Sequence, residues 1–247
     1  MFDDLTLGTC SYNTPHITMT MLKSWKVINS DVTNKLCIID NSHNEDTAQL
    51  LQDNEINYQR VVGGTHYNGV QLMLNNVTTK YLLLVDTDVI FNKDLTDIIN
   101  FFINGNYTIM GEVCGDRGGQ PLFPRIHPWF CLINVEHIRS KKIAFVNMPK
   151  IKATNSQQYY ANMPLISSVR NRKYDVGATF LEDIIHARLK AYNSKLDPEY
   201  YFHYEGMSWR GSSGIPSLVN AQKANEIAYQ SDYEKYKDVD IKGWFKS

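Results

Sequence analysis

Apolar and polar positions change period repeatedly through the first hundred residues of the chain. Apolar runs of strand length occupy four segments, residues 5–10, 36–39, 58–62 and 81–85. Between them, apolar side chains recur at helical spacing, as in residues 70–77, where they stand at i, i+3, i+4 and i+7. Strands that alternate with amphipathic helices predict an α/β fold with a mostly parallel sheet, right-handed crossovers and helices on both faces.

Local signals predict where two of these helices begin and end. Thr14 and Pro15 offer an N-cap followed by proline at the first helical position. Asp94 is the expected N-cap of a helix over residues 95–102, and Gly105 stands near its end.

The second half of the chain is less regular. We expect strands at residues 108–113 and 129–135, a loop at residues 114–128, and helices at residues 180–192 and 220–237. The last of these helices is polar and is expected on the surface. The loop and the polar segment 155–172 are expected to cover a binding site.

Two aspartates follow the fourth predicted strand directly, in the sequence Asp86-Thr87-Asp88. Side chains at i and i+2 of an extended chain point the same way, so both carboxylates are expected to face one spot. In open α/β sheets, ligands bind beyond the carboxyl ends of the strands, and paired carboxylates there suit Mg²⁺ or Mn²⁺. The alternative is that Asp86 caps a turn and Asp88 is solvated, which is less favoured because apolar residues flank the pair.

Other polar residues are expected at the same edge of the sheet. Asp40 ends the second strand, where it could accept a nucleobase N–H or merely form an Asx turn. His203 follows an aromatic run and can complete a carboxylate–metal site, although a lone histidine there is more often a core residue. Glu182 stands fourth in Thr-Phe-Leu-Glu, a capping box that would occupy it at a helix start, so Asp175 is preferred as a free carboxylate.

Composition excludes several classes of protein. The 247 residues fit one α/β domain, and a net charge of −1 gives no general attraction to nucleic acid or to anionic membranes. No apolar run approaches the roughly 20 residues that a membrane-spanning helix needs, and no signal peptide is visible at the start. The four cysteines match no zinc spacing, so we expect reduced thiols in a cytoplasmic protein.

In chain order, several segments resemble motifs of nucleotide-sugar-dependent glycosyltransferases of the GT-A fold, specifically the inverting family 2-like group. They are residues 9–13, 39–42, 79–88 and 128–134, and then Asp175-Val176-Gly177, His203 and Ser208-Trp209. A lone DxD motif is common by chance, whereas this ordered set, spread over roughly positions 5 to 210, is much more specific.

The resemblance implies a three-layer α/β/α, Rossmann-like GT-A fold. It also implies metal-dependent transfer of a sugar from a nucleotide-diphosphate sugar, UDP- or GDP-sugar above all, to a carbohydrate or other hydroxyl acceptor, with inversion. Residues 1–215 would form the glycosyltransferase domain, with a nucleotide-binding half over about 1–113 and an acceptor-binding half over about 114–215. Residues 216–247 would form a C-terminal helical tail.

The same resemblance suggests roles for individual residues. Mn²⁺ or Mg²⁺ would be held by Asp86, Asp88 and His203. The nucleotide sugar would contact Thr9, Ser11, Tyr12, Asn13, Asp40, His66, Asp86 and Thr87. Trp129 and Trp209 would lie on the acceptor side. Asp175 is the first choice for the catalytic base, with Glu182 and Asp183 as alternatives.

Two rival functions stay open. A sugar-phosphate nucleotidyltransferase has a similar sheet but usually carries an early glycine-rich, basic loop, whereas residues 8–13 hold one glycine and no lysine or arginine. A carbohydrate-binding protein could keep the fold and lose turnover, although Asp86, Asp88, Asp175 and His203 weigh against it. A Rossmann dehydrogenase would need G-x-G-x-x-G after the first strand, which is absent.

Overall fold

The chain is described by a computed structural model. It covers residues 2–115, 123–147, 149, 177–194, 198–204, 206–207 and 216–246, with the backbone alone for residues 216–224. No helix of these segments is both long and apolar enough to cross a lipid bilayer.

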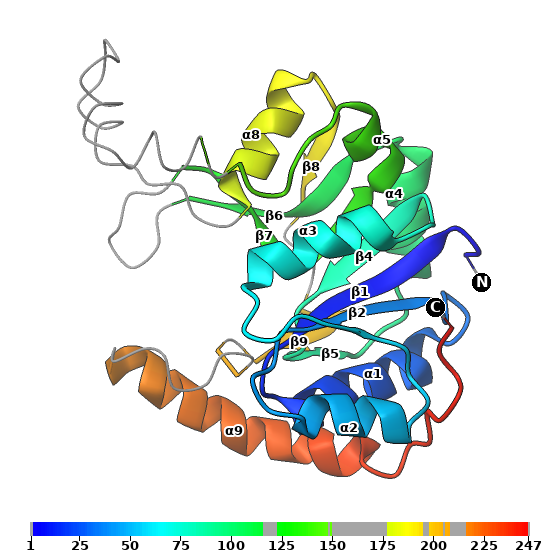
Figure 1. Cartoon of the computed structure of the whole chain (residues 1–247), viewed down its shortest axis with the longest axis vertical. Coiled ribbons are helices and arrows are strands. Elements are labelled where there is room, and N and C mark those ends of the chain that lie inside the picture. Colours follow the sequence, from blue (N-terminus) through cyan, green and yellow to red (C-terminus); the bar gives the residue numbers. More distant parts are fainter. Residues whose placement is uncertain are drawn as a thin grey trace.

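A seven-stranded sheet forms the centre of the molecule, in the order β3-β2-β1-β4-β7-β6-β8 (Figure 1). Its strands are β1 (Leu5–Ser11), β2 (Leu36–Asp40), β3 (Gln59–Arg60), β4 (Tyr81–Val85), β6 (Ile109–Cys114), β7 (Arg125–Asn134) and β8 (Ala191–Asn193). β7 runs antiparallel to β4 and β6, and the other pairings are parallel. The mostly parallel α/β sheet expected from the sequence is confirmed.

Two layers of helices cover the sheet, because successive apolar residues along its inner strands point to opposite faces and both faces are buried. Leu5 and Leu7 of β1 face a cluster that includes α1 (Pro15–Asn29), α2 (Asp46–Asp53) and α4 (Thr96–Asn104). The opposite face of the sheet packs on α3 (His66–Asn76), α5 (Val135–Ser140) and α8 (Ala178–His186). Figure 1 shows α3 and α8 on one side of the sheet and α1 and α2 on the other. The three-layer architecture is therefore confirmed.

A second, two-stranded sheet joins distant parts of the chain. β5 (Val89–Phe91) pairs antiparallel with β9 (Tyr201–His203), and Val89 stands opposite His203. Because β5 begins directly after the Asp86–Asp88 segment, this pairing brings His203 to the end of β4.

The C-terminal part of the chain packs onto the central domain. Helix α9 (Pro216–Tyr236) lies along α1, with Tyr229 and Tyr236 buried (Figure 1). The helix expected at residues 220–237 is confirmed, but it contributes to a core instead of lying wholly on the surface. After it, Ile241 and Phe245 enter the same buried cluster as β1 and α1.

Two sequence predictions in the second half were wrong at element boundaries. Residues 125–128 belong to β7 and not to a loop, because this part of β7 pairs with the end of β6. The helix expected at residues 180–192 ends at His186, and the chain then forms β8, which pairs with β6. In both places, pairing with a neighbouring strand overrides the local pattern.

Candidate metal and substrate site

Asp86 and Asp88 lie at the carboxyl end of β4, where the chain turns. The strand ends at Val85, and the Asp86 amide donates to the Trp129 carbonyl at 2.9 Å. The Val89 amide then donates to the Asp86 carbonyl at 3.4 Å. The two carboxylates therefore converge through a turn and not through the extended alternation that we expected. Asp88 is almost fully buried.

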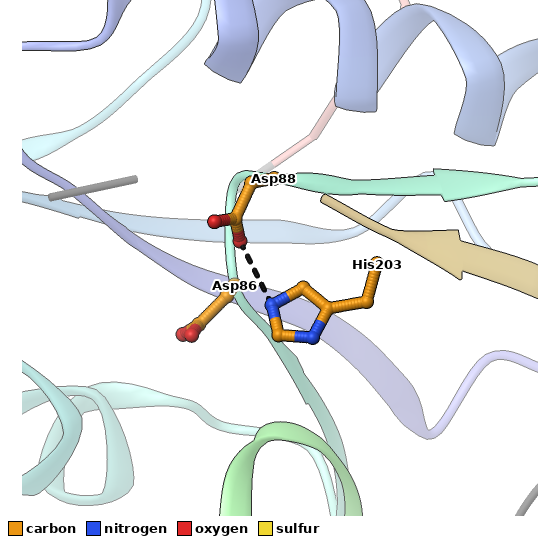
Figure 2. A group of neighbouring side chains, drawn as sticks. All are labelled: Asp86, Asp88 and His203. Carbon is orange, nitrogen blue, oxygen red and sulfur yellow. Dashed lines mark ion pairs between the residues drawn. The ribbon is translucent and has the colours of Figure 1, made fainter. Parts of the chain in front are cut away.

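His203 reaches the aspartates from β9. Its Nε2 atom lies 3.3 Å from Asp88 Oδ1, and the Tyr204 amide donates to the Asp88 carbonyl at 2.8 Å. Its ring stacks on Trp129 with 4.5 Å between centroids and 14° between planes. Figure 2 shows the imidazole directed at Asp88, with Asp86 beside it. The imidazole is thus held in place by a strand pairing, an ion pair and a ring stack.

His66 approaches Asp86 from the opposite helix layer. It is the first residue of α3, and its Nε2 atom lies 3.1 Å from Asp86 Oδ1. Burial disfavours the charged carboxylate, but the charge and hydrogen bond of His66, helped by His203 and His127, hold the pKa of Asp86 below its ordinary value. Burial likewise disfavours the imidazolium, but Asp86 and then Asp88 raise the pKa of His66.

These opposite shifts predict that the ion pair stabilises the fold only within a pH window. Because the pKa of His66 is raised in the folded protein, the pair stabilises the fold below the unfolded-state pKa of about 6.5. This stability is lost as the pH rises through the folded-state pKa of His66. Because the pKa of Asp86 is lowered in the folded protein, the pair stabilises the fold above the unfolded-state pKa of about 3.9. This stability is lost as the pH falls through the folded-state pKa of Asp86. In EDTA, we expect His66→Gln to lower stability by about 1 kcal/mol near pH 5.5 and less at pH 8.5.

Thermal unfolding of both proteins across this pH range measures the effect. The exposed His186, changed to glutamine, is the matched control, and near pH 5.5 it should lower stability less than His66→Gln does. A His66→Gln penalty that grows toward pH 8.5 would contradict the charged pair.

The donor atoms of Asp86, Asp88 and His203 suit a divalent cation. One ligand atom from each residue lies within 4.8 Å of the other two. An octahedral ion with bonds of about 2.1 Å has neighbouring ligand atoms about 3 Å apart and opposite ones about 4.2 Å apart, so these three atoms would move closer together on binding an ion.

Asp40 lies inside the packing of the loops that follow β1 and β2. Its Oδ1 atom accepts hydrogen bonds from Ser11 Oγ at 2.8 Å and from the amide and hydroxyl of Ser42 at 3.2 and 2.5 Å. Arg60 Nε is 3.8 Å from its other oxygen. The Asx turn that we weighed against nucleotide binding is therefore present, and contact of Asp40 with a ligand would require these bonds to be exchanged.

The other residues predicted to bind the nucleotide sugar differ in access. Thr9, Ser11 and Thr87 are buried, and the hydroxyls of Thr9 and Thr87 have no hydrogen-bond partner among the described residues. Tyr12 is exposed beside His43, and Asn13 is exposed with φ of 52°. Of this set, Tyr12 and Asn13 present their side chains to solvent, and His66 is partly exposed.

The candidate bases are only partly described. Asp175 lies outside the described residues. Glu182 and Asp183 lie on α8, half-buried. The capping box expected at Glu182 was wrong, because the N-cap residue of α8 is Gly177, whose φ is 85°, and the Thr179 hydroxyl accepts from the Asn147 amide instead.

The start of α8 is fixed by its packing on β7. A Cβ atom at Gly177 would stand 2.2 Å from the Ile126 carbonyl oxygen, so only glycine fits there. β7 runs antiparallel to β4, and Phe130 pairs with Val85, so Ile126 lies at the edge of the sheet that carries the aspartates. The start of α8 is therefore held near the site.

Trp129 lies beside the aspartates, and Trp209 lies outside the described residues.

One residue that acts on the site was missed by sequence reasoning. His127, two residues before Trp129 in β7, helps to lower the pKa of Asp86, and its ring lies 5.9 Å from that of Trp129. The period-two spacing of His127 and Trp129 would have indicated it, had residues 125–128 been read as strand.

Comparisons with known proteins give matches among solved structures alone. No protein-family model and no curated protein sequence matches the chain. The galactosyltransferase LgtC, in complex with donor and acceptor sugar analogs, aligns with 92% of this chain and 99% of its own, at 12% identity and a TM-score of 0.49. S. aureus TarS 1–349 in complex with UDP aligns over 80% and 59%, at 14% identity and 0.49.

A third structure is the apo form of the glycosyltransferase GlyE of Streptococcus pneumoniae TIGR4. It aligns over 96% of this chain and 64% of its own, at 14% identity and a TM-score of 0.49. The chain spans 35% of another, longer TarS chain.

Proposed function

We propose that the protein transfers a sugar from a nucleotide-diphosphate sugar to an acceptor hydroxyl, with a divalent metal and with inversion. The observation that carries this proposal is the convergence of Asp86, Asp88 and His203 at the carboxyl edge of the sheet. Side chains from β4 and β9, more than 100 residues apart, meet at the edge where open α/β sheets bind ligands.

The leaving nucleoside diphosphate gains negative charge as the glycosidic bond breaks. Bound Mn²⁺ or Mg²⁺ would supply positive charge that stabilises it. Asp86 and Asp88 would supply carboxylate oxygens as ligands of the ion. The stack on Trp129 fixes the orientation of the His203 imidazole beside these carboxylates. We also propose that the partly buried Trp129 lies on the acceptor side, where its ring would pack on the apolar face of an acceptor sugar.

An acceptor-side carboxylate would take the proton from the attacking hydroxyl, and Asp175 is our choice for this base. We expect Asp175→Asn to leave donor affinity unchanged and to lower kcat by about 100-fold or more. Stopped assays at saturating donor and acceptor, with separate titration of donor binding, measure both quantities.

The alternatives Glu182 and Asp183 provide the control for this experiment. Glu182→Gln and Asp183→Asn should keep kcat within a few fold of the wild type. An unchanged kcat in Asp175→Asn, with a large loss in one of the other two variants, would assign the base to α8.

The function is tested by a donor screen with and without Mn²⁺. UDP-, GDP- and CDP-sugars are added to the protein, and the melting temperature is measured. Metal-dependent stabilisation by one nucleotide sugar supports the transferase. A response to a nucleoside triphosphate with a sugar phosphate favours the nucleotidyltransferase, and no response to any nucleotide favours a binding protein.

We also propose a cytoplasmic location. The four cysteines are free and unpaired in disulfides, and Cys10 and Cys131 are buried. Burial raises the pKa of both thiols above the ordinary value, with a smaller contribution from Asp86, so they are unreactive core residues suited to a reducing compartment.

A further inference from the structure

A cavity of about 360 Å³ lies between the amino end of α1 and the middle of α9, the helix that packs along α1 (Figure 1). One wall is formed by residues 13–17, and the other by Tyr229, Gln230 and Tyr233. The volume is within the range of about 300 to 1,000 Å³ that small-molecule sites occupy. Among the described lining residues, only Asn13 belongs to the set predicted for the transfer reaction, so the purpose of the cavity is a separate question.

Contacts between the two helices hold the walls of this cavity in place. The Tyr229 hydroxyl lies 2.7 Å from Thr20 Oγ1 and 3.2 Å from the His16 carbonyl oxygen, so hydrogen bonds join α9 to α1. Tyr229 is buried, and its ring meets that of Tyr204 edge to face at 5.6 Å. The Tyr233 ring meets the His16 ring in the same way at 6.4 Å. Walls that are already ordered lose little conformational entropy when a ligand binds.

The lining of the cavity is polar without carrying acidic or strongly basic groups. The described lining residues include no lysine, arginine, aspartate or glutamate, so a phosphate or a carboxylate would bind without a counter-charge. Each wall instead supplies one side-chain amide, from Asn13 and from Gln230, and an amide both donates and accepts hydrogen bonds. At the start of α1, the His16 and Ile17 amides have no acceptor within the helix, and the Thr14 side chain makes no capping bond.

Aromatic rings beside side-chain amides match the two kinds of surface that a sugar presents. A pyranose ring has apolar C–H faces, which pack on aromatic rings, and a rim of hydroxyls, each of which donates and accepts hydrogen bonds. Tyr233 is half-buried and Gln230 is exposed, so both side chains are accessible to a ligand in the cavity. A contact between helices that served packing alone would be filled by apolar side chains.

We propose that this cavity is a saccharide-binding site that takes a neutral hexopyranose unit. Tyr233 packs on a C–H face of the ring, and the amides of Gln230 and Asn13 bond to its hydroxyls. The unpaired backbone amides at the start of α1 donate to a sugar oxygen. The inference goes beyond the proposed transfer reaction and does not depend on it, because it concerns a saccharide bound at a place additional to the acceptor side that we propose at Trp129.

Binding of the methyl glycosides of glucose, galactose, mannose and N-acetylglucosamine, measured by saturation-transfer NMR titration in EDTA, tests the assignment. We expect at least one glycoside to bind with a dissociation constant on the order of 1 mM. Tyr233→Ala should weaken this binding about 10-fold because the ring face is lost. Gln230→Leu should weaken it about 5-fold because the amide is lost.

Two variants are matched controls for this titration. Tyr233→Phe keeps the aromatic ring and should bind the glycoside like the wild type. Ile227→Ala, at an exposed position of α9 that does not line the cavity, should also leave binding unchanged. Melting temperatures show whether each variant has folded, and Gln230, as an exposed residue, is the safer of the two changes in the cavity.

Three results would overturn the inference. The first is that the wild type binds none of the four glycosides. The second is binding that Tyr233→Ala and Gln230→Leu leave unchanged, since the sugar would then lie elsewhere, and a loss of binding in Trp129→Ala would place it on the acceptor side. The third is displacement of the glycoside by UDP or GDP in EDTA, which would assign the cavity to the donor.

Discussion

Changing Asp88 to asparagine is expected to lower sugar transfer at least about 100-fold while the protein stays folded. An amide keeps the size of the carboxylate but is a weaker ligand for Mg²⁺ or Mn²⁺ and adds no negative charge. Asp88 also forms the ion pair that faces His203, so the substitution disrupts two of the three donor groups at once. Initial rates measured over a Mn²⁺ titration should show both a lower kcat and a higher Mn²⁺ requirement.

Asp97→Asn is the matched control for this variant. Asp97 is an exposed carboxylate in the first turn of α4, and its loss should leave transfer unchanged. Wild-type turnover by Asp88→Asn at ordinary Mn²⁺ concentrations would show that the group does not hold the catalytic ion.

The second large effect is on stability. Phe245→Ala is expected to cost about 3 kcal/mol of unfolding free energy, because Phe245 is 7% exposed and its removal leaves a cavity in the main core. The backbone next to Phe245 is also bonded to the central sheet, since the Leu36 amide of β2 donates to the Lys246 carbonyl at 2.7 Å. Urea unfolding at equilibrium measures the change.

Phe101→Ala provides a comparison with the same chemical change at a site that is 46% exposed. It should cost clearly less than Phe245→Ala. Equal costs, or a loss of under about 1 kcal/mol for Phe245→Ala, would show that the C-terminal segment is an accessory to the fold and not part of its core.

The architecture could be predicted from local patterns because its first half is built from regular units. The strand at residues 81–85 is continuously apolar since both of its faces are buried, and it was recognised by that property. Helix α3 was recognised from its apolar spacing, which matches the buried face of Val70, Met73 and Leu74. Because the strands were expected to be parallel, Asp40 and Asp86 were expected at the same edge of the sheet.

The parts that could not be predicted depend on contacts between distant segments. Strand β8 has three exposed residues and no period, and only pairing with β6 makes it a strand. The start of α8 is set by the approach of Gly177 to Ile126, which overrides the capping-box pattern one turn later. The stack of Trp129 on His203 joins β7 to β9, and no local signal in either strand reports it.

The convergence of the donor atoms was expected for one reason and arises from another. We expected Asp86 and Asp88 on one face of an extended strand, whereas a turn brings them together. His203 was proposed from its chemistry together with the family resemblance, and its position is fixed by the pairing of Val89 with His203. Residue type therefore identified the group, and strand pairing determined its geometry.

The most direct measurement is a crystal structure of the protein grown with Mn²⁺ and a nucleoside diphosphate, with data collected for anomalous scattering. We predict one strong manganese peak within about 2.3 Å of oxygen atoms of Asp86 and Asp88 and of His203 Nε2, with diphosphate oxygens completing the coordination. A fully occupied manganese peak bound elsewhere, with these three side chains unchanged and the diphosphate distant from them, would contradict it.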